Sequence, residues 1–322
     1  MKQKVFILLC FLAICLLSCE KDPSSQVEEY IDVALSFGGE VTVTTEPLGK
    51  AGTPTNDLYG INVYYDKNKD GNINTAYGYG LFDNIPDMTI SLLSGYKYKF
   101  ECTLVKDGKT KLQSSNVGKY EAPFGQLLEN KFTLGTSTVM SGIKSGSSRL
   151  KGESSNTETP KLDRYYGETT DYVPSKGGRV TINLIRTVFG AKFIVTGLVN
   201  DGTLTASCGN YWSLTTTENV EGNTIIYTFP DVYACWQNKD SYTLNGTVSI
   251  NYASNRGDWW DISKQQTVTW KRNTLTTVTI SVSPDLSGGT FTFNEEQMGN
   301  DNVIDLGING DGLIDVNVDP NV

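Results

Sequence analysis

Oxygen-bearing side chains alternate along residues 66–74, in the segment DKNKDGNIN, where Asp66, Asn68 and Asp70 precede a glycine. Such oxygens, followed by a glycine at a sharp turn, can wrap one calcium ion. The twelfth position of this loop is Tyr77 instead of the bidentate glutamate of a complete calcium loop. The segment therefore predicts either a calcium site or, as the preferred interpretation, a polar hairpin turn.

Two adjacent tryptophans, Trp259 and Trp260, follow an Arg-Gly-Asp tripeptide at 256–258. Many adhesins present this tripeptide, although a turn explains it equally simply. Adjacent residues of a strand face opposite sides of the sheet, so one of the two indoles can be exposed and stack on a sugar ring. The alternative is that both pack in the core and at its edge.

Histidine is absent from the 322 residues. This excludes Ser-His-Asp and Cys-His catalysis, histidine zinc sites and the commonest general base. Carboxylates are plentiful, but no spacing indicates a glycosidase pair. We therefore expect no enzyme activity and no cofactor apart from the calcium alternative. The formal charge of −9, without a basic run, also argues against nucleic acid as a partner.

Three of the six cysteines lie in the first 19 residues, and the others are Cys102, Cys208 and Cys235. No C-x-x-C pair is present, so neither a zinc motif nor a redox motif is predicted. Cys208 and Cys235 can pair in an oxidising compartment, or all three can be ordinary buried thiols.

The first residues predict the compartment. Lys2 and Lys4 precede an apolar run, Val5–Leu17, that is too short to span a bilayer and is typical of a signal peptide over residues 1–18. Leu-Leu-Ser-Cys at 16–19 resembles the lipobox of bacterial lipoproteins, in which the cysteine thiol takes a diacylglycerol and its amine an acyl chain such as palmitate. Several chains on Cys19 give stable anchoring to the outer membrane.

The next residues, 19–29, are expected to form a lipidated tether. Glu20-Lys21-Asp22 resembles the short charged signals that send some lipoproteins to the outer face of the outer membrane. We therefore expect a cell-surface location.

Period-2 alternation of apolar and polar residues recurs through the mature chain and predicts strands. The first set is 31–37, 40–45, 59–65, 88–93 and 96–105. The second set is 180–186, 191–196, 224–229, 242–252, 265–270 and 275–283. Many short strands separated by Gly, Asn and Asp turns indicate an all-β fold of β-sandwiches.

Ser, Thr, Gly and Lys are concentrated between the two sets of strands, a composition typical of linkers. We expect an N-terminal sandwich over 30–150, a linker or long surface loop over 151–178, and a C-terminal sandwich over 179–322.

Several segments together resemble the fimbrillin family, the lipoprotein subunits of type V pili. These segments are TTEPLGK at 44–50, NDLYGINVY at 56–64, YGLFD at 79–83, GYKYKFECT at 95–103 and VTINLIRTVFGAKF at 180–193. The resemblance implies two tandem transthyretin-like, Greek-key sandwiches. It also implies assembly with other pilus subunits by strand exchange, in which an extended segment of the next subunit fills a groove left by a lost N-terminal strand.

Maturation in this family involves a trypsin-like cut after the first strands, which would correspond here to Lys50 and a new terminus at Ala51. The family usually has an arginine at this site, whereas the first arginine of this chain is Arg149. The alternative is that the chain stays uncut and acts as an anchor, a tip or a stand-alone surface protein.

The candidate donor strand is Gly312–Val318, where Leu313 is followed by Ile314, Val316 and Val318 on one apolar face. It could equally be a strand of its own domain. Two functions follow from the sequence. The first is a structural or adhesive pilus subunit; the alternative is a stand-alone lipoprotein that binds a glycan, or a protein, of a host or bacterial surface.

Overall fold

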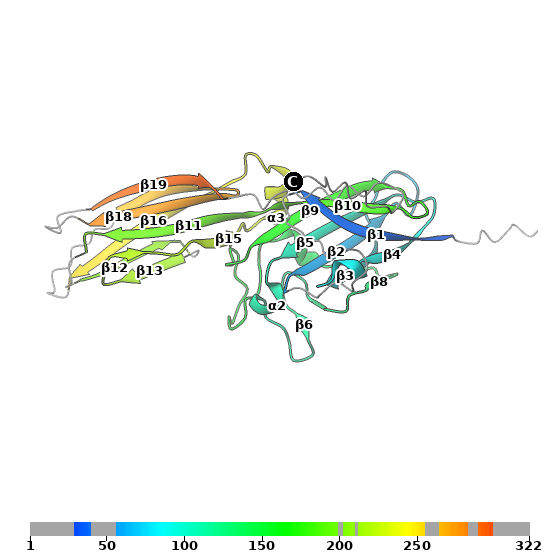
Figure 1. The fold of residues 1–322 in the computed structure, drawn as a ribbon, viewed down its shortest axis with the longest axis horizontal. Helices are drawn as coiled ribbons and strands as arrows, with labels where there is room; N and C mark the ends of the chain where they lie inside the picture. The colour runs from blue at the N-terminus through cyan, green and yellow to red at the C-terminus, as the bar shows by residue number, and fades with distance from the viewer. Residues whose placement is uncertain are drawn as a thin grey trace, which may run out of the picture.

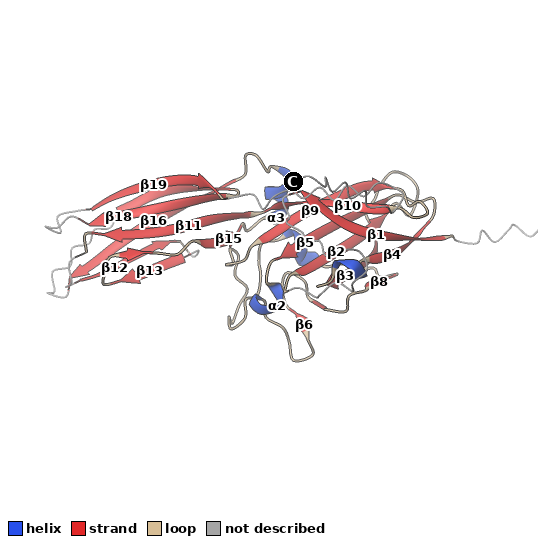
Figure 2. Cartoon of the chain, viewed as in Figure 1, coloured by secondary structure: helices blue, strands red, loops and turns tan. Residues whose placement is uncertain are grey.

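The structure is a computed structural model that describes residues 29–39, 56–198, 202–209, 212–254, 264–282 and 289–298. These residues form an elongated molecule of two units placed end to end (Figure 1). Strands make up most of both units, and the helices are short (Figure 2). The predicted all-β class is therefore confirmed.

The first unit is one sheet of eight strands in the order β4-β1-β10-β9-β5-β2-β3-β8. Its strands are β1 (Tyr30–Gly39), β2 (Leu58–Tyr65), β3 (Thr75–Phe82), β4 (Thr89–Leu93), β5 (Tyr98–Val105), β8 (Phe132–Leu134), β9 (Arg164–Tyr172) and β10 (Arg179–Arg186). Side chains of β1, β4 and β10 meet those of β2 and β5 in one buried cluster, so the sheet bends around a single core. The β9–β10 pairing is short, at Tyr166–Ile185 and Tyr165–Arg186, and this allows the bend.

Apolar alternation explains which face of each strand is buried. In β10, Val180, Ile182 and Leu184 are buried, whereas Thr181 and Asn183 between them are exposed. A one-residue shift would turn the apolar set to solvent, so burial itself specifies the register.

An irregular layer covers the outer face of β2 and β5. It contains β6 (Lys119–Tyr120), β7 (Gln126–Leu127), α2 (Gly108–Lys111) and the 3-10 helix Ser141–Lys144. A second 3-10 helix, Ile85–Asp87, lies on the other side, where Ile85 packs against the core of the first unit. Phe124 and Met140 of this layer are buried together with Leu58 and Val105 of the sheet. A Cβ at Gly60 would lie 2.6 Å from the Phe124 ring, so the close approach requires glycine there.

The second unit is a sandwich of two sheets, β14-β11-β18-β19, with β15 also paired to β11, and β13-β12-β16-β17. Its elements are β11 (Val188–Thr196), β12 (Gly202–Cys208), β13 (Trp212–Thr216), β14 (Val220–Glu221), β15 (Ile225–Thr228), α3 (Val232–Gln237), β16 (Thr243–Ser254), β17 (Lys264–Lys271), β18 (Thr274–Val282) and β19 (Gly289–Gln297). Its core holds Phe189, Phe193 and the fully buried Trp270.

The division between the units differs from the predicted one. Residues 151–178 were expected to be a linker or loop, yet they contain β9, which pairs with β5 and β10 inside the first sheet. Strand β10, expected to open the C-terminal sandwich at 179, also belongs to the first sheet. The second half of β9, residues 168–172, is largely polar and has the composition of a linker. Its first half is buried, with Tyr165 in the core of the first unit and Tyr166 against Tyr233 and Trp236 of α3.

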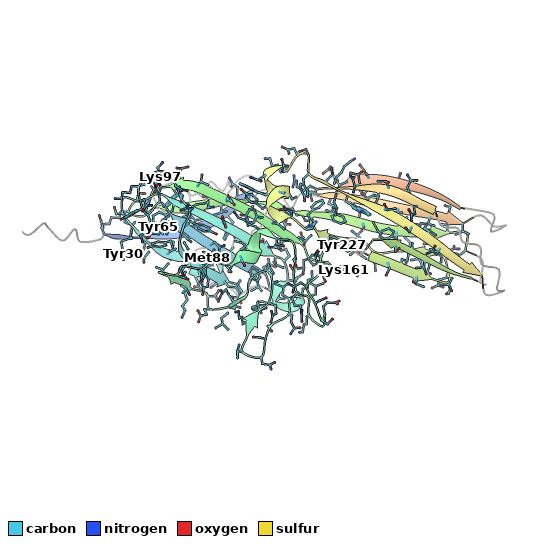
Figure 3. The ribbon with its side chains drawn as sticks, turned by 180° about the vertical axis from the view of Figure 1, so that it is seen from behind. Tyr30, Tyr65, Met88, Lys97, Lys161 and Tyr227 are labelled. Atoms are coloured by element: carbon cyan, nitrogen blue, oxygen red, sulfur yellow. The ribbon has the colours of Figure 1, made fainter. Side chains whose placement is uncertain are left out.

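Backbone hydrogen bonds tie the two units together. Only Thr187 separates β10 from β11, and its carbonyl accepts a hydrogen bond from the N–H of Phe229. The N–H of Thr228 donates to Pro160, near Lys161 and Tyr227 at the junction (Figure 3). Among the helices within the described ranges, none is long and apolar enough to cross a membrane.

Candidate functional site

Strand β1 lies between two strands that contact different halves of it. Residues 30–34 pair antiparallel with β4, from Tyr30–Leu93 to Ala34–Thr89. Residues 34–39 pair parallel with β10, from Ala34–Arg179 to Gly39–Leu184. A single strand therefore joins β4 to the rest of the sheet.

The inner face of β1 is apolar. Val33, Leu35 and Phe37 are buried, and the Phe37 ring stacks on Tyr59 at 5.2 Å. Burial of each such side chain contributes about 1.5–3 kcal/mol. The Leu35 N–H also donates to the carbonyl of Met88 (2.9 Å), which lies beside this strand (Figure 3).

The outer face of β1 is polar and bonded to its neighbours. Asp32 accepts a hydrogen bond from the Ser91 hydroxyl of β4 (2.5 Å), and Ser36 donates to the Val180 carbonyl of β10 (3.2 Å). Side-chain bonds therefore reinforce the pairing on both sides of the strand.

Two buried tyrosines hold β4 independently of β1. The Tyr98 hydroxyl accepts from the Leu93 N–H (2.9 Å) and donates to the Leu93 carbonyl (3.1 Å), while the Tyr77 hydroxyl donates to Ser91 (2.8 Å). Burial raises the pKa of Tyr77 to about 12, and the pKa of Tyr98 is also raised, mainly by burial, so both remain protonated donors. The candidate site is thus the position of β1, with β4 and β10 on either side and core side chains beneath it. We call this position the β1 groove, because removal of β1 would leave it open.

Most site residues predicted from the sequence lie outside the described residues. These are the lipidation residue Cys19, the maturation residues Lys50 and Ala51, the indoles Trp259 and Trp260, and the donor residues Leu313, Ile314, Val316 and Val318. The expected strand 40–45 lies outside them as well. Their assignments stay predictions.

The calcium-like segment lies in the hairpin loop between β2 and β3. Both carboxylate oxygens of the buried Asp66 accept backbone N–H groups of the loop, from Asp70 (3.1 Å) and Gly71 (2.8 Å). Asp70 in turn accepts the N–H of Asn72 (2.9 Å). These bonds are those of a side-chain-stabilised turn. Within the described ranges, no three acidic or cysteine side chains gather in a way that could hold a metal ion.

The three mature cysteines that the structure describes, Cys102, Cys208 and Cys235, are buried thiols. Cys102 lies in the core of the first unit, and the other two lie in the core of the second. Burial raises the pKa of Cys102 above its usual range. A buried, protonated thiol reacts slowly with alkylating reagents, so the reactivity of these cysteines shows whether solvent has entered each core.

A charged cluster on the outer face of β5 and β9 was not predicted from the sequence. The Glu101 carboxylate, 1% exposed, lies 2.8 Å from the ammonium groups of both Lys99 and Lys144. Lys144 also lies 3.2 Å from Glu168, which faces Glu101 across the strand pair. Burial opposes ionisation of Glu101, but the two ammonium groups outweigh it and hold its pKa below the usual range. The only signal in the sequence is that Lys99 and Glu101 occupy alternate positions of YKFECT.

A buried arginine was missed as well. Arg164 of β9 is fully buried, and its guanidinium donates to the Thr103 hydroxyl (2.9 Å), the Ser145 carbonyl (2.5 Å) and the Ile143 carbonyl (2.8 Å). Burial lowers its pKa. Since Ser145 bridges to Asp231 of the second unit, Arg164 fixes the loop that joins the two units.

Comparison with known proteins gives no match to a protein-family model and none to a curated protein. Among solved structures, the chain is similar to the fimbrial anchor protein Mfa2 from Porphyromonas gingivalis (12% identity, TM-score 0.36, covering 84% of this chain and 100% of that one). It is also similar to the tip fimbrial protein Mfa3 from the same organism, with C-terminal truncation (8%, 0.34, 84% and 100%), and to a fimbrial assembly protein from Parabacteroides distasonis (13%, 0.34, 84% and 96%). These structures are fimbrial proteins; at such identities and TM-scores, what they do is not transferred to this chain.

Proposed function

We propose that this protein is a cell-surface, lipid-anchored pilus subunit that assembles by strand donation into the β1 groove. The observation that carries the proposal is the position of β1, which precedes the other described strands and fills the gap between β4 and β10. After a cut at Lys50, β1 would be joined to the rest of the chain by non-covalent contacts alone. Its departure would leave the edges of β4 and β10 without a partner, which is the arrangement that a donated strand completes.

The candidate donor matches β1 in pattern and length. Val33, Leu35 and Phe37 are buried at alternate positions of β1, and Ile314, Val316 and Val318 follow the same spacing. Residues 312–322 provide eleven positions for the ten of β1. A strand with this alternation can present one apolar face to the core and a polar face to solvent.

The donor is tested by paired variants of its two faces. We expect Ile314→Asp with Val316→Asp to abolish the ladder of polymers on non-reducing gels, because a carboxylate in the groove would be buried without a partner. The matched variant Asp315→Ala with Asn317→Ala changes the other face and should keep the ladder. Ladders that persist in the first variant would exclude 312–318 as the donor.

The cut is tested on protein taken from the cell surface. N-terminal sequencing should give a free Ala51 for a matured subunit, and Lys50→Gln should abolish that terminus while Lys50→Arg preserves it. A blocked, lipidated Cys19 in the wild type would instead identify an uncut anchor or stand-alone protein.

A further inference from the structure

A cleft of ≈ 690 Å³ lies at the junction of the two units. One wall is formed by Glu168 of β9 with Asn183 and Ile185 of β10, and the other by residues 236–241, at the end of α3 and just beyond it. Its volume is in the range of pockets that bind small molecules. Such pockets combine an apolar surface with a few fixed polar groups, and this cleft has both.

The apolar surface is the half-buried indole of Trp236, which other rings hold in place. Tyr233 stacks against it at 5.8 Å and 27°, and Tyr166 meets it edge-on at 5.8 Å and 79°. The Lys144 ammonium lies 4.3 Å from the centre of the Tyr233 ring and completes the support. An indole fixed from behind is a preorganised platform, so a ligand would lose little free energy in ordering it.

The opposite wall holds a fixed carboxylate. Glu168 accepts a hydrogen bond through Oε1 from the Tyr166 hydroxyl (2.5 Å), and the same oxygen lies 3.2 Å from the Lys144 ammonium. Both contacts use Oε1, which leaves Oε2 to accept further hydrogen bonds. The side chain is therefore oriented, and its charge is compensated by Lys144.

The remaining lining selects the chemistry of the ligand. Exposed amides, Asn183, Gln237 and Asn238, offer both donors and acceptors. Lys239 is the cationic side chain among the lining residues and has Asp240 beside it, so a phosphate or other anion would meet no net positive charge. A wholly apolar ligand would take Oε2 of Glu168 and the remaining donors and acceptors of the amides away from water without replacing those hydrogen bonds, which is costly.

We propose that this cleft binds a neutral saccharide, with a sugar ring stacked on Trp236 and its hydroxyls bonded to Glu168, Asn183 and the amides after α3. A sugar ring presents an apolar face and a rim of hydroxyl groups, which is the combination that the two walls match. The site does not depend on strand exchange and would operate in a cut or an uncut chain.

Affinity electrophoresis of the full chain in native gels containing mannan, dextran, xylan or a β-1,3-glucan tests the proposal. We expect at least one polysaccharide to retard the wild type, with an apparent affinity that Trp236→Ala lowers at least tenfold and Trp236→Phe lowers less. Asn183→Ala, on the other wall and at an exposed position, should weaken binding without disturbing the Trp236 cluster.

Tyr96→Ala provides the matched control, since it removes a half-buried aromatic far along the first unit and should leave retardation unchanged. Absence of retardation by all four polysaccharides overturns the proposal, as does equal retardation of wild type, Trp236→Ala and Asn183→Ala. Polymer ladders should be unaffected in each variant, which separates this site from the β1 groove.

Discussion

The two units use the same local arrangement at their first strands. β1 lies between the antiparallel β4 and the parallel β10, and β11 lies between the antiparallel β14 and β15 on one side and the parallel β18 on the other. Both strands bury alternate apolar residues, and aromatic stacking reinforces both: Phe37 on Tyr59, and Phe189 on Trp270 at 5.1 Å. The packing that holds each strand is therefore of the same kind.

The difference is in the connections along the chain. β11 follows β10 after one residue, so it cannot leave its sheet unless β10 is displaced from the first unit as well. β1 is followed by the long segment 40–57 before β2 begins, and a single cut there separates it. The two strands are thus packed alike but connected differently: one cut within 40–57 would free β1, whereas β11 would stay joined to β10. If the proposed strand donation holds, this connectivity makes β1 the strand that is replaced.

The largest effect is expected when that connection is broken. In a chain with a specific protease site inserted between Lys50 and Ala51, cutting should allow β1 to dissociate in mild denaturant and open the first core. The burial lost with Val33, Leu35 and Phe37, at about 1.5–3 kcal/mol each, is comparable to the 5–15 kcal/mol that stabilises a whole domain. Alkylation followed by mass spectrometry should then find Cys102 modified and Cys208 and Cys235 protected.

A matched cut in the second unit controls for nicking itself. The same site placed between Thr217 and Glu218, in the exposed turn before β14, should leave all three thiols protected. Modification of Cys208 or Cys235 as fast as Cys102 after the first cut would mean that the two cores open together, and the comparison would fail.

The second prediction concerns the loop shared by the units. Arg164→Met should lower the free energy of unfolding by about 3–5 kcal/mol, because the carbonyls of Ile143 and Ser145 stay buried without their donor. Since Ser145 bridges to Asp231, both units should lose stability, in contrast to the loss of β1. Hydrogen exchange of each unit measures this; loss of protection in the first unit alone would contradict it. Arg186→Met, which breaks the pair with Asp163, is the milder control, because these two side chains are 12% and 18% exposed and water can reach the group left behind.

Alternation in the sequence predicts the strands that have one face in a core, such as β10 and β16, to within a few residues. β3 and β9 are absent from that prediction because glycines interrupt their pattern. A Cβ at Gly78 would lie 2.7 Å from the Thr133 carbonyl, and one at Gly167 would collide with the Asn183 carbonyl of the neighbouring strand. Glycine is needed at these positions because another segment of the chain approaches the backbone closely. The pattern of neighbouring residues in the sequence cannot show such a contact.

The groove was only partly predictable for the same reason. The alternation of β1 indicates an apolar face, but its partners β4 and β10 are far along the chain and are selected by the shared core. The Trp236 cleft was beyond sequence reasoning, since its walls come from residues near 168, 183 and 236. The aromatic pair that the sequence does indicate, Trp259 and Trp260, lies outside the described residues.

The smallest predicted effect is a pH-dependent loss of stability, which we compare between one carboxylate of each unit, Glu101 and Glu221. The pKa of Glu101 is held below its unfolded value, so its contribution to stability is present at neutral pH and is lost as pH falls through the folded pKa, below about 4.5. Glu101→Gln should cost about 1.5–3 kcal/mol at pH 7, the worth of hydrogen bonds to a charged group, and its deficit relative to wild type should shrink as pH falls from 5 to 3. Thermal melts across this range measure the deficit.

The control is Glu221→Gln in the second unit, which removes an exposed partner of Lys192. Because solvent screens this pair, the free energy of unfolding should change little at any pH. A Glu101→Gln deficit that stays constant down to pH 3 would mean that the cluster stabilises the first unit through packing and not through charge.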